Sequence, residues 1–549
     1  MKKRIFILFF LSCNIVFAQF VPSRFWIKFT DKSGSPYTIA DPSAYLSQRA
    51  IDRRTKQYIA IQENDIPVDT TYIRIVLNTG VTLLNRSKWF NAVVVKTVDT
   101  NIITTIRNFP FVVGAKPVGK IKWTFNDASP LPPSFKTNHA NAANSLDYGP
   151  AYNQIDMIGG ICLHDNGYTG EGMQIAVIDA GFINADTLHV FDSINLSGRV
   201  LGTRNFAYTD PSVYKYDSHG TAVLSTMAGN WPGQLVGTAP ASSYYLLLSE
   251  QGGSEYAVEE DNWVAAAEYA DSAGADVINT SLGYNTFDYS PENYTYADMN
   301  GHTAHITIAA DIAVSKGMIV VCGAGNEGGG SWQHITAPAD ADSIIAVGAV
   351  DGNRNYVYFS SIGPTYDGRV KPDVCAQGSG TIIAASNGAI TAGNGTSFAA
   401  PIIAGMAACL WQANPTKRNT EVIDAIKKSS SLYYNPNNQL GYGIPNFCIA
   451  SSLLKGTDPK YFQEDSLVSL TPSPFSNIID GIFYAATTEV LKIELHDVTG
   501  KLVLQEEKSM WGNNYNNFKI SGLDFLGAGI YMITISGDNK GYKQKVLKL

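Results

Sequence analysis

The middle of the chain alternates between short apolar runs and longer segments whose apolar positions recur every three or four residues. Strands buried on both faces of a parallel sheet give such uninterrupted apolar runs, and amphipathic helices connect them. The pattern therefore predicts an α/β domain at residues 146–455, with helices on both faces of a parallel sheet. Sites in such sheets lie at the carboxyl ends of the strands. The expected strands are 173–181, 242–250, 275–283 and 318–325, and the expected helices are 219–229, 254–274 and 304–317.

Residues 19–125 form a separate region that is rich in β-branched positions. Segments 71–77, 91–98 and 111–118 are predicted to be strands because of their Val, Ile and Thr content. Segment 101–109 is predicted to be a short helix. This order predicts a small α+β domain.

Two more regions differ from the α/β domain in composition and in their hydrophobic pattern. Residues 126–145 are rich in Pro, Asn and Ser without periodicity, which predicts an exposed linker. Residues 465–549 show strand-like alternation around a Thr499-Gly500 turn, followed by two further alternating segments. This last region is predicted to be a small antiparallel β domain.

The first 18 residues combine a basic start, an apolar run and a Val-Phe-Ala ending before Gln19. That composition is typical of a secretory signal peptide. No later stretch has about 18 uninterrupted apolar residues, so no transmembrane segment is expected in the mature protein.

Charge and cysteine content narrow the range of functions. The formal net charge of −8 argues against a nucleic-acid partner, because such proteins usually present a basic face. Five cysteines remain after the signal peptide, so at least one is unpaired within the chain, and most are expected to be small buried residues. None has C-x-x-C spacing, so no metal site is assigned.

Three glycine-flanked polar residues lie where the sheet would place a site. Asp179 ends an apolar strand, His219 begins a helix, and Ser397 begins another. Each is weak evidence alone, since a strand-ending Asp is often a helix cap and a lone His is often structural. Together they form the set that nucleophilic acyl transfer requires: a nucleophile, a base, and a carboxylate that orients the base. Pro401 is expected in the first turn of the helix that Ser397 begins.

The segments around these residues resemble the subtilisin-like serine proteases. "VIDAG", "HGT" and "GTSFAAP" resemble the three signature motifs of that family, in its order Asp, His, Ser. "VINTSLG" resembles its substrate-binding strand, and "VVCGAGNEG" resembles the segment that carries its oxyanion-hole asparagine. The resemblance covers about 220 residues. It implies a subtilisin-like fold and a serine endopeptidase that acts through an acyl-enzyme intermediate and needs no cofactor.

The resemblance also implies roles for single residues. Ser397 would be the nucleophile, His219 the general base, and Asp179 the orienting carboxylate. The Asn326 amide would hold the oxyanion together with the Ser397 backbone N–H. The substrate-binding residues implied are Ser281, Leu282, Gly283, Gly323, Ala324 and Gly325.

Two residues depart from the family pattern. Ala180 follows the aspartate where the family usually has Ser or Thr, so one hydroxyl partner of the carboxylate is missing. Phe398 follows the serine where the family usually has Met. Neither change removes a reacting group.

The flanking regions resemble parts known from secreted relatives. Residues 19–125 resemble the family's propeptide, which would act as a chaperone and then block the cleft as an inhibitor. The alternative is a permanent accessory domain. Residues 465–549 resemble the β-sandwich sorting domain of the type IX secretion system of Bacteroidetes, which implies export through the periplasm to the cell surface or medium and contact with that secretion machinery. The alternative is an adhesive or carbohydrate-binding module.

As a peptidase, the protein would have protein or peptide substrates as its partners. Two other functions compete with this hypothesis. Residues 323–328 fit the dinucleotide fingerprint G-x-G-x-x-G, which would suit an oxidoreductase. That motif must open a helix, and the following "GGGSWQHITAPAD" predicts none. The other competitor is an inactive surface-binding protein with the same fold. Related proteases often carry structural calcium, which acidic loops such as 186–193 and 351–356 would suit, but no ligand is assigned.

Overall fold

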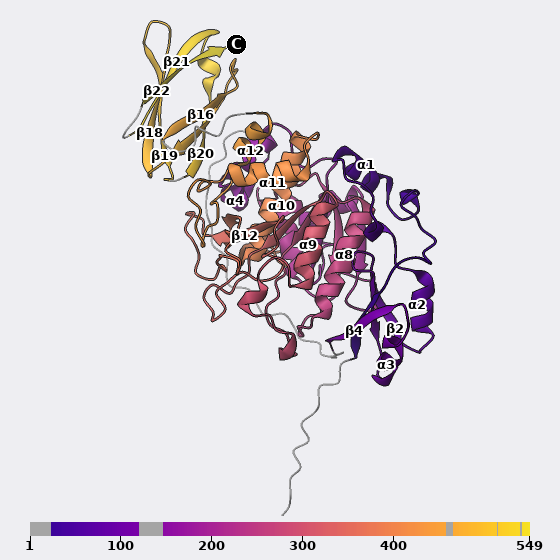
Figure 1. The fold of residues 1–549 in the computed structure, drawn as a ribbon. Coiled ribbons are helices and arrows are strands. Elements are labelled where there is room, and N and C mark those ends of the chain that lie inside the picture. The colour runs from indigo at the N-terminus through magenta and orange to yellow at the C-terminus, as the bar shows by residue number, and fades with distance from the viewer. Residues whose placement is uncertain (1–22, 120–145, 457–464, 513, 538–540) are drawn as a thin grey trace, which may run out of the picture.

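The computed structural model describes residues 23–119, 146–456, 465–512, 514–537 and 541–549. They form three successive parts, seen in Figure 1 as an indigo N-terminal domain, a central domain and a yellow C-terminal domain. The expected signal peptide, the expected linker at 126–145 and residues 120–125 lie outside the described residues.

The central domain is built on a seven-stranded sheet in the order β13-β12-β11-β10-β5-β9-β6. Every neighbouring pair in it is parallel. All four strands expected from the sequence are present, and β6, β12 and β13 extend the sheet. The strands are β5 (Gln174–Asp179), β6 (Val200–Asn205), β9 (Ser243–Leu248), β10 (Val277–Thr280), β11 (Ile319–Gly323), β12 (Ile345–Val350) and β13 (Val374–Gln377).

Helices cover both faces of this sheet, as the alternating pattern predicted. The three crossover helices are α7 (His219–Ala228), α8 (Val258–Ala273) and α9 (His305–Ser315). The other helices are α4 (Tyr152–Asp156), α5 (Gly160–Asp165), α6 (Asp192–Leu196), α10 (Thr396–Ala413), α11 (Asn419–Lys428) and α12 (Phe447–Leu454). Along the chain α7 lies between β6 and β9 and packs against α10, whereas α8 packs against α9, so the two helix pairs lie on opposite faces.

The 18-residue helix α10 runs through the core, and nearly all of its side chains are buried. Among the described residues it is the one helix that is long and apolar enough to cross a membrane, but it lies inside the domain. Two short hairpins complete the domain: β7 (Asn230–Trp231) with β8 (Leu235–Val236), and β14 (Ser379–Ala384) with β15 (Ile390–Asn394).

The N-terminal domain has a four-stranded antiparallel sheet in the order β2-β3-β1-β4. Along β1, Phe25, Ile27 and Phe29 point into the domain's own core, while Trp26 packs on the opposite face against the central domain. The elements are β1 (Arg24–Phe29), α1 (Gln48–Lys56), α2 (Thr70–Leu77), β2 (Thr82–Ser87), β3 (Ala92–Lys96), α3 (Asn101–Arg107) and β4 (Val112–Gly119).

The prediction of a strand at 71–77 is wrong, because these residues lie in the helix α2. Asp69 caps it by accepting a hydrogen bond from the Thr71 N–H at 2.7 Å. Ile73 and Val76, three residues apart, face the core of the domain. The short helix expected at 101–109 is present as α3.

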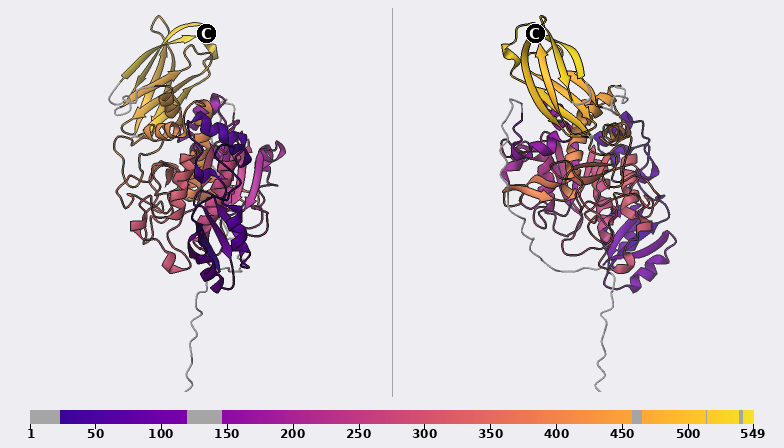
Figure 2. Two further views of the ribbon diagram at one scale, coloured as in Figure 1. Left: turned by 45° about the vertical axis from the view of Figure 1, so that its right-hand side comes forward. Right: turned by 90° about the vertical axis from the view of Figure 1, so that its left-hand side faces the viewer.

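The C-terminal domain is a sandwich of two antiparallel sheets, β16-β17-β20 and β19-β18-β21-β22 (Figure 2). An apolar core lies between the two sheets. Ile449 of α12 packs against Ile482 and Tyr484 of this domain, so the last helix of the central domain supports the sandwich. Its strands are β16 (Ser466–Thr471), β17 (Ile479–Ala485), β18 (Glu489–His496), β19 (Leu502–Met510), β20 (Asn514–Ile520), β21 (Gly529–Ser536) and β22 (Gly541–Lys548).

Candidate active site

Asp179 and His219 meet at the carboxyl edge of the central sheet. Asp179 is the last residue of β5 and is fully buried, and His219 is the first residue of α7. The His219 ring Nδ1 lies 2.7 Å from Asp179 Oδ1, which also accepts the Ala180 N–H at 2.8 Å. Asp217 accepts the backbone N–H of His219 at 2.7 Å, which fixes the start of the helix.

Gly220 makes this approach of helix to strand possible. A Cβ at this position would lie 2.4 Å from the carbonyl oxygen of Gly181 and 3.0 Å from the Cβ of Asp179. Any larger residue would therefore push the His219 end of α7 away from the carboxylate. Glycine at position 220 is therefore required by the close packing of α7 against the residues around Asp179 and Gly181.

The environment shifts the pKa of His219 upward. Burial alone would lower the pKa of the imidazole, but the charge and hydrogen bond of Asp179 outweigh it. With Nδ1 bonded to the carboxylate, Nε2 is the nitrogen left to exchange a proton with another group.

Ser397 is the second residue of α10 and is 9% exposed. Its hydroxyl donates to the Ser281 carbonyl at 3.4 Å, and no hydrogen bond joins it to His219 in the described part of the chain. The His219 ring lies near the same turn, with its centroid 6.1 Å from that of Phe398. Hydrogen bonds between nucleophile and base are often formed only when substrate is bound.

Pro401 is the sixth residue of α10, in its second turn rather than the expected first. Proline has no N–H to donate to the carbonyl four residues earlier, which is that of Ser397. The Ser281 hydroxyl donates to this free carbonyl at 2.9 Å. The proline thus leaves an acceptor that joins the Ser397 turn to the segment after β10.

Asn326 lies beside the first turn of α10. Its side-chain oxygen accepts the Thr396 N–H at 2.9 Å and the Thr396 hydroxyl at 3.2 Å. Because the oxygen is held this way, the Nδ2 amide group remains free to donate. The Ser397 N–H, in the first turn of a helix, has no acceptor within the helix.

These residues surround a cavity of about 90 Å³. It includes five of the six expected substrate-binding residues, while Ala324 is fully buried behind the wall. Thr336 and Thr396 are further lining residues that the sequence did not single out. Thr396 adjoins Ser397 and could have been noticed, whereas nothing in the sequence around Thr336 points to the site. The complete lining is Ser281, Leu282, Gly283, Gly323, Gly325, Asn326, Glu327, Thr336, Thr396 and Ser397.

The glycine-rich segment after β11 does not open a helix. Residues 324–344 are all described, and none of them is helical before β12 begins at Ile345. Gly328 packs against backbone, since a Cβ there would lie 2.2 Å from the Ser360 carbonyl oxygen. The helix that a dinucleotide fingerprint requires is therefore missing.

The two departures from the family pattern have visible effects. Asp179 Oδ2 is buried without a hydrogen-bond partner among the described residues, as expected from alanine at position 180. Phe398 is 7% exposed and its ring packs over Gly393, where a Cβ would lie 2.6 Å from the ring edge. The larger side chain is thus accommodated by a glycine on β15.

Three glutamates, two in the loop after β9 and one in the first turn of α8, gather close to the Asp179–His219 pair. Glu250, Glu255 and Glu259 each place a carboxylate oxygen within 4.8 Å of the other two. Burial raises the pKa of Glu250 to about 7 and that of Glu255 to about 8, and it raises the pKa of Glu259 as well. Tyr284, next to the substrate-binding residues, donates its hydroxyl to Glu250. The sequence analysis missed this group.

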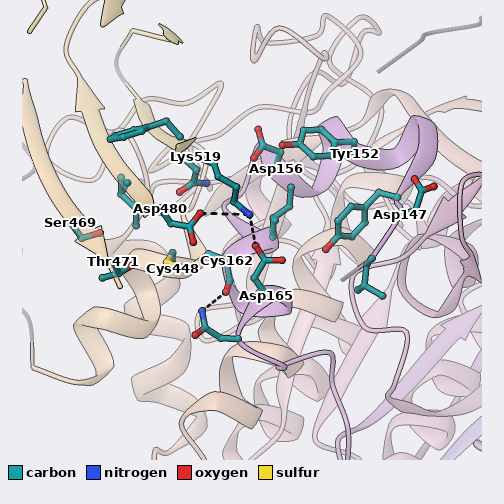
Figure 3. Close-up of a pocket in the computed structure, with 18 of the residues that line it drawn as sticks. Asp147, Tyr152, Asp156, Cys162, Asp165, Cys448, Ser469, Thr471, Asp480 and Lys519 are labelled. Carbon is teal, nitrogen blue, oxygen red and sulfur yellow. Dashed lines mark hydrogen bonds and ion pairs between the residues drawn. A yellow bond between two sulfur atoms is a disulfide. The ribbon is translucent and has the colours of Figure 1, made fainter. Parts of the chain in front are cut away.

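A second cavity, of about 430 Å³, lies between α5 and the C-terminal domain (Figure 3). Lys519 points into it between Asp165, at 3.1 Å, and Asp480, at 3.6 Å. Asp179, His219 and Ser397 do not line it, so this cavity is separate from the candidate active site.

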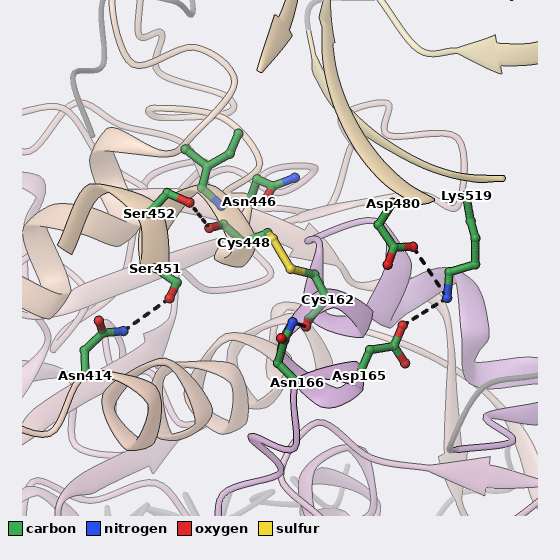
Figure 4. The surroundings of a disulfide bond; sticks show 11 residues. Cys162, Asp165, Asn166, Asn414, Asn446, Cys448, Ser451, Ser452, Asp480 and Lys519 are labelled. Carbon is green, nitrogen blue, oxygen red and sulfur yellow. Dashed lines mark hydrogen bonds and ion pairs between the residues drawn. A yellow bond between two sulfur atoms is a disulfide. The ribbon is translucent and has the colours of Figure 1, made fainter. Parts of the chain in front are cut away.

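The Cys162–Cys448 disulfide forms part of the wall of this second cavity and joins α5 to α12 (Figure 4). No pattern in the sequence indicated which cysteines would pair. Cys322, Cys375 and Cys409 are free and buried, and burial raises the pKa of each thiol, that of Cys375 to about 12. As expected, most of the five are small buried residues.

The end of the N-terminal domain reaches the edge of the site. Gly119, the last residue of β4, packs on Tyr256, since a Cβ there would lie 2.9 Å from the Tyr256 Cβ. Arg24 donates to Gln251 at 2.7 Å, in the same segment as the glutamates.

Models of known protein families match all three parts of the chain. The subtilase family matches residues 170–443. The peptidase S8 propeptide domain of Bacteroidota matches residues 24–130, and the secretion system C-terminal sorting domain matches residues 469–548.

Individual proteins similar to this chain include several subtilisins. Subtilisin NAT of Bacillus subtilis subsp. natto is 34% identical over 310 residues, covering 55% of this chain and 71% of the relative. Subtilisin of Bacillus pumilus is also 34% identical over 310 residues, covering 98% of the relative. The crystal structure of the epidermin leader peptide processing serine protease of Staphylococcus aureus superimposes with a TM-score of 0.53 at 17% identity, over 79% of this chain and 99% of that one, which shows a shared fold.

Proposed function

The chain belongs to the subtilase family of serine endopeptidases, and from this premise we propose that Asp179, His219 and Ser397 form its catalytic triad. The observation that carries the proposal is the 2.7 Å contact between His219 Nδ1 and the buried Asp179 carboxylate. That bond fixes the tautomer in which Nε2 can take a proton from a serine hydroxyl.

The reaction then follows from the positions of the side chains. Ser397 Oγ turns from the Ser281 carbonyl to His219, loses its proton to Nε2, and attacks the scissile carbonyl carbon. The oxyanion that forms accepts hydrogen bonds from Asn326 Nδ2 and the Ser397 N–H. His219 returns the proton to the departing amine, which leaves an acyl-enzyme. Water then attacks the acyl-enzyme by the same steps in reverse.

Substrate binding uses the segment after β10. Residues 281–283 continue beyond that strand and line the 90 Å³ cavity. An extended peptide can pair with their backbone as an added strand and place a side chain in the cavity. Glu327 lies in the wall, so a basic side chain would be favoured there.

We propose that the protein is made as a zymogen. Gly119, in β4 of the N-terminal domain, packs against Tyr256, and the expected propeptide boundary at 125 and linker at 126–145 come next in the sequence. Cleavage in that segment would separate the inhibitor from the enzyme.

The C-terminal domain carries the signature of a secretion sorting domain, which indicates export to the cell surface or medium. We propose that the route crosses the periplasm and that residues 465–549 bind the secretion machinery. We place the boundary between the two domains between residues 455 and 465.

The test compares residues 19–549 with the same chain carrying Ser397→Ala. Only the wild type should release an N-terminal fragment of roughly 100–125 residues, as a self-cleaving zymogen would. Only the wild type should react with a fluorophosphonate. Equal processing of both chains would remove autocatalysis, and a wild type that neither processes nor reacts would indicate the inactive, surface-binding alternative.

A further inference from the structure

The cavity beside Ser397 contains a polar group that takes no part in the proposed reaction. Thr336 is 3% exposed, and its hydroxyl oxygen is buried without a hydrogen-bond partner among the described residues. Of the ten residues that line the cavity, all of them described, Thr336 is the one whose side chain holds such an atom. A buried hydroxyl without a partner is costly, so this oxygen marks a place where a bound group can supply the missing hydrogen bond.

The other hydroxyl groups of the cavity are already bonded to one another's surroundings. Ser281 donates to the Ser397 carbonyl at 2.9 Å, and Ser397 donates to the Ser281 carbonyl at 3.4 Å. The Thr396 hydroxyl donates to the Asn326 side-chain oxygen at 3.2 Å. These bonds hold the groups of the proposed reaction in place. Substrate therefore meets one hydroxyl in this cavity that has no such task, that of Thr336.

The backbone fixes Thr336 between the two segments that line the cavity. Its N–H donates to the Ala324 carbonyl at 3.2 Å, in the segment after β11. The next residue, Ala337, exchanges two hydrogen bonds with Tyr284, at 2.8 and 3.0 Å, in the segment after β10. Because both sides are bonded, the position of Thr336 does not depend on a bound substrate.

Two glycines leave room for the Thr336 hydroxyl. A Cβ at Gly283 would collide with the hydroxyl oxygen, and a Cβ at Gly325 would lie 2.9 Å from it. Gly283 belongs to the segment after β10 and Gly325 to the segment after β11, and both line the cavity. The hydroxyl thus lies at the inner side of the cavity, between its two walls.

Glu327 lies at the outer side of the same cavity. It is half-buried, and one of its carboxylate oxygens would lie 3.6 Å from a Cβ on the exposed Gly330. A substrate side chain must therefore pass a charged group before it reaches the neutral hydroxyl of Thr336. The cavity of about 90 Å³ is also smaller than the cavities of about 150 Å³ that hold a benzene ring. Both observations favour a long, narrow side chain.

We propose that Thr336 determines substrate specificity by bonding the end of the side chain that precedes the scissile bond, and that this side chain is unbranched and ends in an amide or ammonium group. Glutamine and lysine are of this kind. The Thr336 hydroxyl accepts a hydrogen bond from either group. An apolar side chain leaves the hydroxyl buried without a partner, and a site built in this way rejects such a substrate. The inference rests on the proposed peptidase function.

The test uses the wild-type enzyme after release of its N-terminal fragment. Its kcat/KM is measured on four peptides that differ only before the scissile bond, where they carry glutamine, lysine, methionine or phenylalanine. Methionine is as long and unbranched as glutamine but has no N–H group. The glutamine and lysine peptides should be cleaved at least about 10-fold better than the methionine peptide, and the phenylalanine peptide least well. Equal kcat/KM for glutamine and methionine would overturn the proposal.

Two substitutions at position 336 separate a role in specificity from a structural one. Thr336→Val keeps the shape of the side chain, and should lower kcat/KM about 10-fold for the glutamine and lysine peptides while leaving that for methionine unchanged. Thr336→Ser keeps the hydroxyl and should retain the preference of the wild type, and it serves if Thr336→Val fails to fold. An equal loss on all peptides in Thr336→Val, or a lost preference in Thr336→Ser, would contradict the assignment.

A substitution of Glu327 distinguishes the two groups of the cavity. Glu327→Gln should lower kcat/KM for the lysine peptide and keep the ratio between glutamine and methionine, because that ratio depends on Thr336. A ratio that follows Glu327 instead would overturn the proposal. An enzyme that cleaves none of the peptides would remove the proposed function together with this inference, whereas cleavage without these preferences would remove the inference alone.

Discussion

At the scale of single residues, the candidate site depends on neighbouring groups that hold the Ser397 backbone carbonyl and the Asn326 side-chain oxygen in place. The missing N–H of Pro401 frees the Ser397 carbonyl for Ser281, and Thr396 holds the Asn326 oxygen. The reactive hydroxyl and amide groups are then oriented by bonds that do not involve substrate. Such preorganisation is a large part of what an enzyme contributes to an acyl-transfer step.

Replacing Asn326 tests the oxyanion site. Asn326→Leu removes the Nδ2 donor and should lower kcat by about 10²–10³, the usual cost of removing one oxyanion-hole donor, with a small change in KM. Steady-state kinetics on a peptide substrate measures this. Asn326→Asp is the matched control for the Thr396 contact, since it keeps the acceptor and loses the donor. Unchanged turnover in both variants would contradict the assigned role.

The Asp179–His219 pair predicts the acid limb of the pH profile. His219 must be neutral to take the serine proton, and its pKa is raised above the ordinary value. Activity should therefore fall as pH drops through that raised pKa. Asp179→Asn should move the limb to lower pH and reduce kcat by about 10⁴, because the tautomer is no longer fixed. Measuring kcat/KM against pH for the wild type and for Asp179→Asn checks this prediction. An acid limb at the same pH in both proteins would contradict the pairing of Asp179 with His219.

Much of this site could be predicted because its residues sit in short motifs at strand ends and helix starts. The roles of Asp179, His219 and Ser397 came from such motifs, and the structure brings the first two into contact. Thr336 and the glutamates at 250, 255 and 259 could not be found in the same way. They meet only when a loop after β9 folds against the segment after β10, and no local pattern records that contact.

At the scale of elements, burial decided where sequence reasoning succeeded. The strands β5, β9, β10 and β11 are buried on both faces and were predicted, whereas β6, which is only partly buried, was not. Segment 71–77 has strand-like Val and Ile content, yet it forms α2 because Asp69 caps it and Ile73 and Val76 share one face. The capping residue and the three-residue spacing outweigh β propensity there. β1 was not predicted, although Phe25, Ile27 and Phe29 alternate with residues that face the other way.

The raised pKa values of two glutamates between β9 and α8 predict how the stability of the fold depends on pH. The pKa values of Glu250 and Glu255 are about 7 and 8 in the folded chain, above the usual value near 4.5. A raised pKa means that their contribution is fully present below about pH 4.5 and is lost as pH rises through 7 to 8. The melting temperature of the Ser397→Ala chain should therefore fall between pH 5 and 9. Glu255→Gln should flatten that fall, and parallel curves for the two chains would contradict it.

At the scale of the whole molecule, the three domains contact one another through a few buried groups. The N-terminal domain contacts α8 along its length, and the C-terminal sandwich rests on α12. These contacts were outside the reach of sequence reasoning because each joins residues far apart in the chain. Arg53 and Asp271, for example, are 218 positions apart.

Removing the disulfide tests the covalent link between α5 and α12. Cys162 and Cys448 are 286 residues apart, so their bond restricts a long loop in the unfolded chain. Replacing both by Ser should lower the free energy of unfolding by about 2–4 kcal/mol. Urea unfolding of the Ser397→Ala chain, with and without the two serines, measures the difference. Identical midpoints would show that the bond adds no stability.

The same bond has a mechanical consequence. The C-terminal domain follows α12 directly, so a pull applied to that domain reaches the rest of the chain through this helix. Cys448 is the second residue of α12, and its bond to Cys162 passes the load to α5. The residues of α12 after Cys448 can unfold under such a pull, while the disulfide holds the start of the helix in place. A pull on the tail is then shared between α5 and the backbone that enters α12, two parts of the central domain whose bonded cysteines lie 286 residues apart in the chain.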